Sequence, residues 1–393
     1  MVLLGTAIIK SSEGGCNEND QKDKLVPIPN DLEAEILTRL PAKSLMKLLC
    51  VSKVWSSIIR SQRFIDSYYA LSSSTRSRFT VTCCNGVSAP AELKRLFIFS
   101  SSFEVKSSSL VAKLDMTIPF DVVLYSNFKC PSIHGFLSCY SNNYQFIVCN
   151  LSTRQVITLP IKGPCASLGY DPIGRQFKAL NLVSSPDRPL KFLVHEVITL
   201  GGTGEVSRNQ VTTARYYPFT DGLYINGSIY YGAWDERLDP LIACFDVRYE
   251  NISFIKVPTD PLFWGDSILI DYRGTLASIF VNAFKPFQSF GLWILEDATK
   301  HEWSKKTFEL PFPLVNMTSP GTNKAGEIIF APKYLPDIGQ PLFIFYYNVE
   351  KKDMRSVRLH GIADDEEFRR RYGLLRETYV TISPEHVESI ASL

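Results

Sequence analysis

The feature that most constrains the fold of this chain is a pattern that recurs about every 50 residues from residue 75 onward. Each later unit starts with an apolar run, continues through a polar turn and ends in a second run of strand-forming residues. Six segments align in this way: RLFIFSSSFEV, QFIVCNLSTRQVITLP, KFLVHEVITLGGTGEV, LIACFDVRYENISFIKVP, LWILEDATKHEWSKKTFELP and LFIFYYNVEKKDMRSVRL. The region from residue 75 to 393 is therefore predicted to be all-β and built from repeated sheets.

The even spacing of these segments favours a closed ring. A period near 50 residues is that of a four-stranded propeller blade, as in kelch-type repeats, and blades need neighbours to bury their faces. We therefore expect a propeller-like domain of about six blades; the alternative is a β-sandwich or meander with accidental spacing. The C-terminal segment ETYVTISPEH offers one further strand to close the ring, and residues 2–9 offer another.

Residues 25–70 have a different pattern, with apolar residues at helical spacing. A first helix, with Asn30 as its cap and Pro41 after its end, would carry Leu32, Ile36, Leu37 and Leu40 on one face. Two further helices would carry Leu45, Leu48 and Leu49, and then Val51, Trp55, Ile58 and Ile59. Three such short helices cannot bury all these side chains. The surplus apolar surface either packs on the rest of the chain or binds a partner protein.

The same stretch resembles an F-box. The family pattern is matched without gaps at Ile28, Pro29, Asp31, Leu32, Glu35, Ile36, Leu37, Arg39, Leu40, Pro41, Lys43, Ser44, Leu45, Val51, Lys53, Trp55, Ile58, Ile59 and Phe64. The family commonly has a cysteine where this chain has Ser52. The resemblance implies a three-helix unit that docks on the Skp1 adaptor of a cullin–RING ubiquitin ligase. It also implies the residues in or beside that interface: Ile28, Pro29, Leu32, Ile36, Leu40, Pro41, Leu45, Val51 and Trp55.

Phrases in the repetitive region resemble the plant F-box-associated domain. One phrase is carried by Asn150, Thr153, Arg154, Leu159 and Pro160, and the next by Gly169, Tyr170, Asp171 and Pro172. A later phrase is carried by Gly227, Tyr230 and Tyr231. Leu151 and Ser152 depart from the family, which usually has Pro-Ser there. Together the two resemblances imply an α+β multidomain protein, with a small three-helix F-box at 25–70 followed by the β-propeller-like domain at 75–393.

Composition argues against several classes of function. The formal net charge is only +2, so we expect no nucleic-acid partner, and no apolar stretch is long enough to span a membrane. The nine cysteines show no C-x-x-C spacing and the five histidines are scattered, so we expect no metal site. Reduced thiols indicate the cytoplasm or the nucleus. Residues 1–24 are polar after their first ten residues and are expected to be a flexible extension.

The sequence contains no motif that predicts catalysis. It has no G-x-S-x-G elbow, P-loop or H-E-x-x-H, so we expect no catalytic residue and no cofactor. The charge run at 364–371 is predicted to be a solvated helix with ion pairs four residues apart. Those pairs would be Asp365–Arg369, Glu366–Arg370 and Glu367–Arg371.

Two functions from different classes fit these features. The first is a non-catalytic substrate receptor, in which the helical unit binds Skp1, and through it a cullin, while the β domain presents loops to an unknown target protein. The second is a propeller-type enzyme or ligand-binding protein with a packed helical appendage. The first requires exposed apolar residues on the helices, and the second requires convergent polar groups in a pocket.

Overall fold

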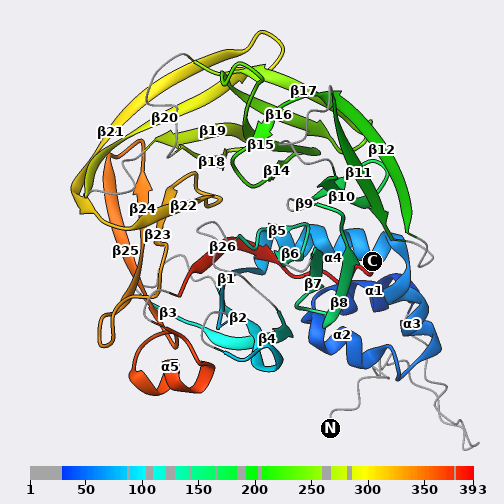
Figure 1. The fold of residues 1–393 in the computed structure, drawn as a ribbon. Helices are drawn as coiled ribbons and strands as arrows, with labels where there is room; N and C mark the ends of the chain where they lie inside the picture. The colour runs from blue at the N-terminus through cyan, green and yellow to red at the C-terminus, as the bar shows by residue number, and fades with distance from the viewer. Residues whose placement is uncertain are drawn as a thin grey trace, which may run out of the picture.

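The computed structural model describes residues 29–85, 89–102, 109–120, 129–141, 144–163, 166–183, 192–201, 206–258, 267–280, 286–375 and 378–393. Ile28, the expected extension at 1–24 and its strand at 2–9 lie outside these residues. In the described ranges, an N-terminal helical segment is followed by a ring of six β-sheets (Figure 1). The predicted helical unit followed by a propeller of about six blades is confirmed. No helix in these ranges is long and apolar enough to cross a membrane.

The helical segment contains four helices, where the sequence predicts three. They are α1 (Asn30–Thr38), α2 (Ala42–Leu48), α3 (Lys53–Arg60) and α4 (Gln62–Thr75). Helix α4 begins where the Ser61 hydroxyl accepts the backbone N–H of Phe64. Phe64, Tyr68 and Ser72 are spaced four residues apart, which places them on one face, and all three are buried. Burial of this face stabilises the fourth helix.

The caps of α1 and α3 also differ from expectation. Pro29, and not Asn30, occupies the N-cap of α1, and its carbonyl accepts the N–H groups of Leu32 and Glu33. Helix α3 is capped by Ser52, whose hydroxyl accepts the backbone N–H of Trp55 at 3.4 Å. The residue that departs from the F-box pattern therefore has a local structural role, because serine is among the preferred N-cap residues.

Each sheet is one blade, with its strands arranged from the centre of the ring outward (Figure 1). They follow chain order except at the two strands that close the ring, one in blade 1 and one in blade 6. Blade 1 is β26 (Val380–Val387), β1 (Ser77–Cys84), β2 (Arg95–Ser102) and β4 (Lys113–Pro119). Blade 2 is β5 (Ser132–Ile133), β6 (Phe136–Ser141), β7 (Gln145–Asn150) and β8 (Gln155–Pro160). Blade 3 is β9 (Ala166–Asp171), β10 (Gln176–Leu182), β11 (Phe192–Leu200) and β12 (Ser207–Ala214).

The remaining blades follow the same plan. In blade 4, β13 (Tyr217–Pro218) and β14 (Leu223–Ile225) both pair with β15 (Ser228–Trp234), which is followed by β16 (Pro240–Asp246) and β17 (Asn251–Lys256). Blade 5 is β18 (Ser267–Tyr272), β19 (Thr275–Phe280), β20 (Phe287–Asp297) and β21 (Glu302–Leu314). Blade 6 is β22 (Met317–Thr322), β23 (Ile328–Pro332), β24 (Leu342–Asn348), β25 (Asp353–His360) and β3 (Ser109–Val111).

Hydrophobic clusters fill the interfaces between neighbouring blades. Between blades 4 and 5, for example, Ile225 and Ile242 pack with Leu269 and Leu276. Comparable clusters lie at each of the other five interfaces. A blade alone would expose these side chains to water, so the ring depends on every blade having two neighbours.

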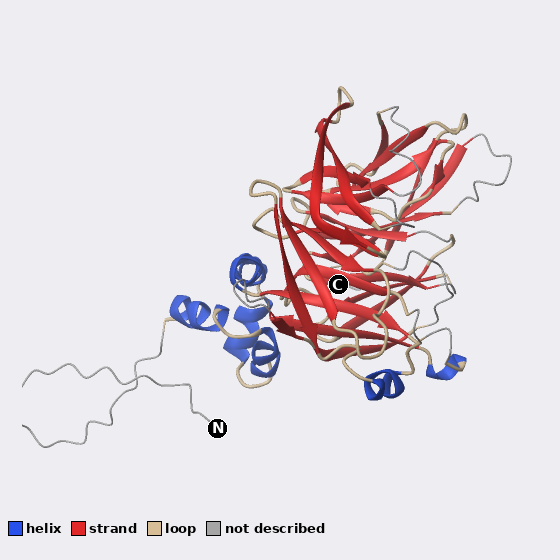
Figure 2. Cartoon of the chain, turned by 90° about the vertical axis from the view of Figure 1, so that its left-hand side faces the viewer, coloured by secondary structure: helices blue, strands red, loops and turns tan. Residues whose placement is uncertain are grey.

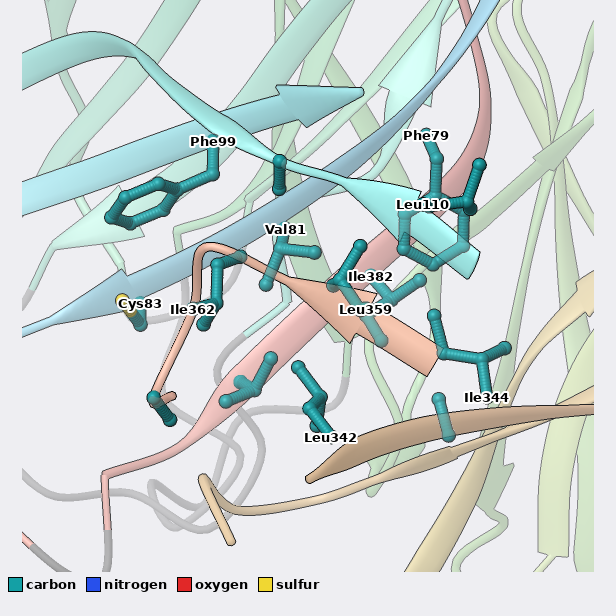
Figure 3. Close-up of a cluster of buried hydrophobic side chains, with 14 of the residues drawn as sticks. Phe79, Val81, Cys83, Phe99, Leu110, Leu342, Ile344, Leu359, Ile362 and Ile382 are labelled. Carbon is teal, nitrogen blue, oxygen red and sulfur yellow. The ribbon is translucent and has the colours of Figure 1, made fainter. Parts of the chain in front are cut away.

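The ring is closed by strands from distant parts of the chain. The C-terminal strand β26 pairs with β1, so that Val81 lies opposite Ile382, which confirms the predicted C-terminal closing strand. On the outer side, β3 pairs in parallel with β25, with Leu110 opposite Leu359. Side chains from blades 1 and 6 form one buried cluster at this join (Figure 3). The closure therefore combines backbone pairing at two strands with a shared core.

Candidate functional site

Four large apolar side chains of the helical segment are exposed. The exposed fractions are 51% for Leu32, 48% for Ile36, 66% for Val51 and 49% for Val54. Leu32 and Ile36 lie four residues apart on α1 and so share one face. Val51 lies two residues before α3 and Val54 lies in its first turn, and α3 packs beside α1. Apolar groups gathered on one small unit in this way are typical of a protein-binding surface.

The other residues implied by the F-box resemblance occupy three different environments. Pro29 and Pro41 are exposed at the N-caps of α1 and α2. Leu40 and Trp55 are half-buried and pack against the core of the helical segment. Leu45 is fully buried in that core at 0% exposure. Leu45 therefore supports the surface from beneath in the free chain, and its direct contact with a partner stays a prediction.

Val54 was not among the residues implied by the resemblance. It lies three residues after Val51 and four before Ile58, and this helical spacing could have identified it. We define the exposed set of Leu32, Ile36, Val51 and Val54 as the apolar helical surface.

The helical segment is mounted on one face of the propeller (Figure 2). In blades 2 to 6 the inner strand pairs antiparallel with the strand that follows it, so the turns that join these two strands all lie on the same face. Helix α4 contacts three of these turns. Tyr69 stacks on His134, Asp66 pairs with Arg175 at 3.2 Å, and Lys324 donates to the carbonyl of Ser73.

A buried carboxylate joins three elements at this junction. The side chain of Asp115, on β4, is only 4% exposed. It pairs with Lys43 of α2 at 3.1 Å and with Arg154 of the β7–β8 turn at 2.8 Å, and Ser100 donates a hydrogen bond to it. Burial alone would raise the pKa of Asp115, but these hydrogen bonds and the charges of Lys43 and Arg154 lower it. Lys43 belongs to the F-box pattern and Arg154 to the F-box-associated pattern, so residues from both patterns meet on one acid.

A second buried carboxylate lies next to the first. Glu388, just after β26, has a side chain 3% exposed. It accepts hydrogen bonds from the hydroxyl of Tyr68 at 3.0 Å and from the backbone N–H of Ala42 at 3.4 Å. The guanidinium of Arg78, on β1, pairs with Glu388 and lies 3.7 Å from Asp115. The carboxylates of Asp115 and Glu388, with Arg78 between them, connect α2 and α4 to blade 1, and we call them the acidic pair.

An aromatic stack joins the helical segment to blades 2 and 3. The ring of His134 lies between Tyr69 of α4 and Tyr170 of β9, with centroid distances of 3.7 and 3.9 Å. Burial lowers the pKa of His134 to about 4. On β26, His386 is bonded to the hydroxyl of Ser132 at 2.9 Å, and burial likewise lowers its pKa to about 4. Both imidazoles are therefore neutral at physiological pH.

These neutral histidines predict a loss of stability on mild acidification. In the unfolded chain they bind protons near their ordinary pKa of 6.5, whereas in the folded chain they bind them only near 4. Between these values the unfolded state binds more protons, so the free energy of unfolding should fall by up to about 1.4 kcal/mol per pH unit for each histidine. Urea denaturation at pH 7 and pH 5.5 measures this loss. The variant His134→Asn with His386→Gln should reduce the slope but not abolish it, because burial also lowers the pKa of His195 to about 4. An unchanged slope would contradict the assignment.

The residues of the F-box-associated phrases form structural contacts. Asn150 is fully buried, and its amide donates to the carbonyls of Ser389 and Ala391, which fixes the C-terminal tail against blade 2. Gly169 lies so close to Val247 of the next blade that a Cβ at this position would approach that side chain to 2.5 Å. The Asp171 carboxylate accepts the backbone N–H of Ile173 and shapes the β9–β10 turn. These phrases therefore specify blade packing and chain ends.

Comparisons with known proteins agree with both parts of the fold. A family model described as the F-box domain matches residues 27–67, and one described as the F-box associated beta propeller domain matches residues 80–387. F-box protein At1g30790 of Arabidopsis thaliana is 49% identical over 95% of this chain and 100% of its own length. Putative F-box protein At1g32660 of the same plant is 46% identical, over 91% of this chain and 82% of its length. F-box protein DOR, also from Arabidopsis thaliana, is 32% identical over 93% of each chain.

Proposed function

The chain belongs to the F-box proteins that carry an F-box-associated β-propeller, and on this basis we propose that it is the substrate-receptor subunit of an SCF-type ubiquitin ligase. In this role the F-box docks on a Skp1-like adaptor, and through it on a cullin, while the propeller recruits a target protein for ubiquitination. The cytoplasm and the nucleus are the proposed locations, since the described cysteines are free thiols.

The observation that carries this proposal is the apolar helical surface. Leu32, Ile36, Val51 and Val54 remain exposed although the helices already pack on each other and on the propeller. The alternative explanation for the surplus apolar residues is packing within the chain. The described packing leaves the apolar helical surface uncovered. A protein partner would bury it, and the F-box membership of the chain supports a Skp1-like adaptor as that partner.

The proposed contribution to ubiquitination is proximity, without a chemical step on this chain. A receptor that holds its target near a charged E2 raises the effective concentration of the target lysine. The junction supports this role, because the acidic pair and the aromatic stack both hold the F-box against the propeller. A fixed F-box would present a bound target at a constant distance from the adaptor.

Size-exclusion chromatography with light scattering tests the proposal directly. The full chain is mixed with a purified plant Skp1-like adaptor, and a one-to-one complex is expected. Addition of a cullin N-terminal domain should then shift that complex to a ternary one. If the folded chain elutes separately from the adaptor at micromolar concentrations, the receptor proposal is wrong.

A further inference from the structure

The propeller has a cavity on the face opposite the F-box. Its lining includes residues that lead from one blade into the inner strand of the next, such as Pro131 before β5, Ala166 at the start of β9 and Gly222 before β14. These connections lie on the face away from the first-to-second turns that α4 contacts. The cavity therefore opens between blades 2, 3 and 4, where the F-box does not cover it.

The cavity has the size of one side chain. Its volume is about 120 Å³. A water molecule needs roughly 10–15 Å³ of such space, so the cavity accommodates several waters or one ring-sized group. Pockets for whole drug-sized ligands are larger, at roughly 300–1,000 Å³. The volume of the cavity therefore favours the insertion of one side-chain-sized group over the binding of a whole drug-sized ligand.

The inner walls combine apolar surface with fixed hydrogen-bonding groups. The apolar part is formed by Ile133, Phe146, Leu168, Leu180 and Leu182. The polar part is a chain of three side chains from blades 3 and 4, in which Nε2 of His195 bonds the hydroxyl of Tyr216 at 2.6 Å and Tyr216 bonds the hydroxyl of Tyr231. An aromatic ring with one polar substituent would match a cavity wall that is partly apolar and partly hydrogen-bonding.

Two of the described residues that line the cavity carry a charge. They are Lys129 and Asp221, and both are exposed. His195 is 1% exposed, and burial lowers its pKa to about 4, so its ring is neutral. Burial of its carboxyl group raises the pKa of Asp221, and the charge of Lys129 partly offsets this rise. Against the neutral inner side chains His195, Tyr216 and Tyr231, a charged group would lose its water without an adjacent counter-charge, which disfavours it.

We propose that this cavity binds an uncharged aromatic ring with one hydrogen-bonding substituent, such as a tyrosine side chain of the recruited target. The inference rests on the proposed receptor function for the identity of the partner, and on the cavity alone for the chemistry of the bound group. Aromatic side chains inserted into desolvated pockets are frequent hot spots of protein interfaces. The position on the face away from the F-box leaves a bound target clear of the adaptor.

Ligand-detected NMR with p-cresol, the side chain of tyrosine capped at Cβ, tests the inference on the full chain in complex with the Skp1-like adaptor. Saturable binding with a dissociation constant in the low millimolar range is expected. Toluene, 4-methylbenzoate and benzylamine should each bind at least about 5-fold more weakly, because the first lacks the polar group and the other two are charged. Absence of saturable p-cresol binding, or equal binding of the charged probes, would overturn the proposal.

Two matched variants locate the binding. Ala166 is half-buried at the mouth of the cavity, and Ala166→Phe should abolish p-cresol binding by filling the space. Ala89 is equally half-buried in the β1–β2 connection of blade 1, away from the cavity, and Ala89→Phe should leave p-cresol binding unchanged. If the Ala166→Phe variant binds both the adaptor and p-cresol, the assignment of the binding site to this cavity is wrong and the receptor function stands. If the chain binds p-cresol but not the adaptor, the receptor function is wrong and the binding site stands.

Discussion

The double substitution Ile36→Glu with Val51→Glu should weaken binding of the Skp1-like adaptor at least about 100-fold. Both side chains are apolar and well exposed in the free chain, at 48% and 66%. Loss of a central interface residue costs about 2 kcal/mol or more, and 1.4 kcal/mol corresponds to a factor of ten in affinity. Desolvation of the introduced carboxylates in an apolar interface would add a further cost. Isothermal titration calorimetry of purified proteins measures the effect.

The stability of the same variant separates a binding defect from a folding defect. Exposed substitutions usually change the free energy of unfolding by less than about 0.5 kcal/mol, so its denaturation midpoint should match that of the wild type. Leu238→Glu is the matched control, because Leu238 is 65% exposed but lies in the β15–β16 turn of blade 4, away from the turns that α4 contacts. It should bind the adaptor normally. Equal affinity of the double variant and this control would rule out the apolar helical surface as the docking site.

Leu40→Ala with Trp55→Ala is a less selective test of the same contact. Both residues are half-buried and pack against the core of the helical segment. Their truncation would remove core contacts, which typically costs a few kcal/mol of stability. A loss of adaptor binding could then result from a lost contact or from a folding defect. Substitution of the exposed Ile36 and Val51 leaves only the lost contact.

The substitution Arg78→Met should destabilise the protein by about 3 kcal/mol, the lower end of the cost of an unpaired buried charge. Arg78 lies between Asp115 and Glu388, whose side chains are 4% and 3% exposed. Asp115 would keep Lys43 and Arg154, but Glu388 would retain only neutral donors among the contacts of the described residues. Urea denaturation at pH 7 measures the change in the free energy of unfolding.

A second substitution shows whether the uncompensated carboxylate is the cause. Adding Glu388→Gln to Arg78→Met should restore part of the lost stability, because the amide removes the buried negative charge. Arg175→Met is the control, since the Arg175–Asp66 pair also links propeller and helix but is largely exposed, at 54% and 40%. Exposed pairs contribute less than about 1 kcal/mol. If Arg78→Met costs no more than Arg175→Met, the acidic pair does not hold the junction.

The blades could be predicted from the sequence because their outer hairpins are local. Strands β7 and β8 are joined by a short turn, as are β16 and β17, and each hairpin repeats the same order of apolar run, polar turn and apolar run. A pattern of this kind depends on neighbouring residues only. The parallel pairing of β3 with β25 had no such signal, because its partners are about 250 residues apart in the chain.

The charge run at 364–371 shows where local reasoning fails. Helix α5 (Glu366–Tyr372) contains the predicted pairs Glu366–Arg370 and Glu367–Arg371. The third predicted pair is wrong. Asp365 instead caps the helix by accepting the N–H of Phe368, and Arg369 is buried, where it donates to the carbonyls of Leu375 and Pro336. Helical spacing allowed the pair, but packing of α5 on the propeller turned Arg369 inward.

The sequence by itself determined the repeat of the blades, the helical character of the N-terminal segment and the surplus of apolar side chains there. Each of these follows from the spacing of residues along one element. Only the tertiary structure decided that Leu45 is buried while Ile36 and Val51 are exposed, and that Lys43 and Arg154 meet on Asp115. The exposure of a side chain and the pairing of a charge depend on which distant segments pack together, and the local period of a sequence does not record that choice.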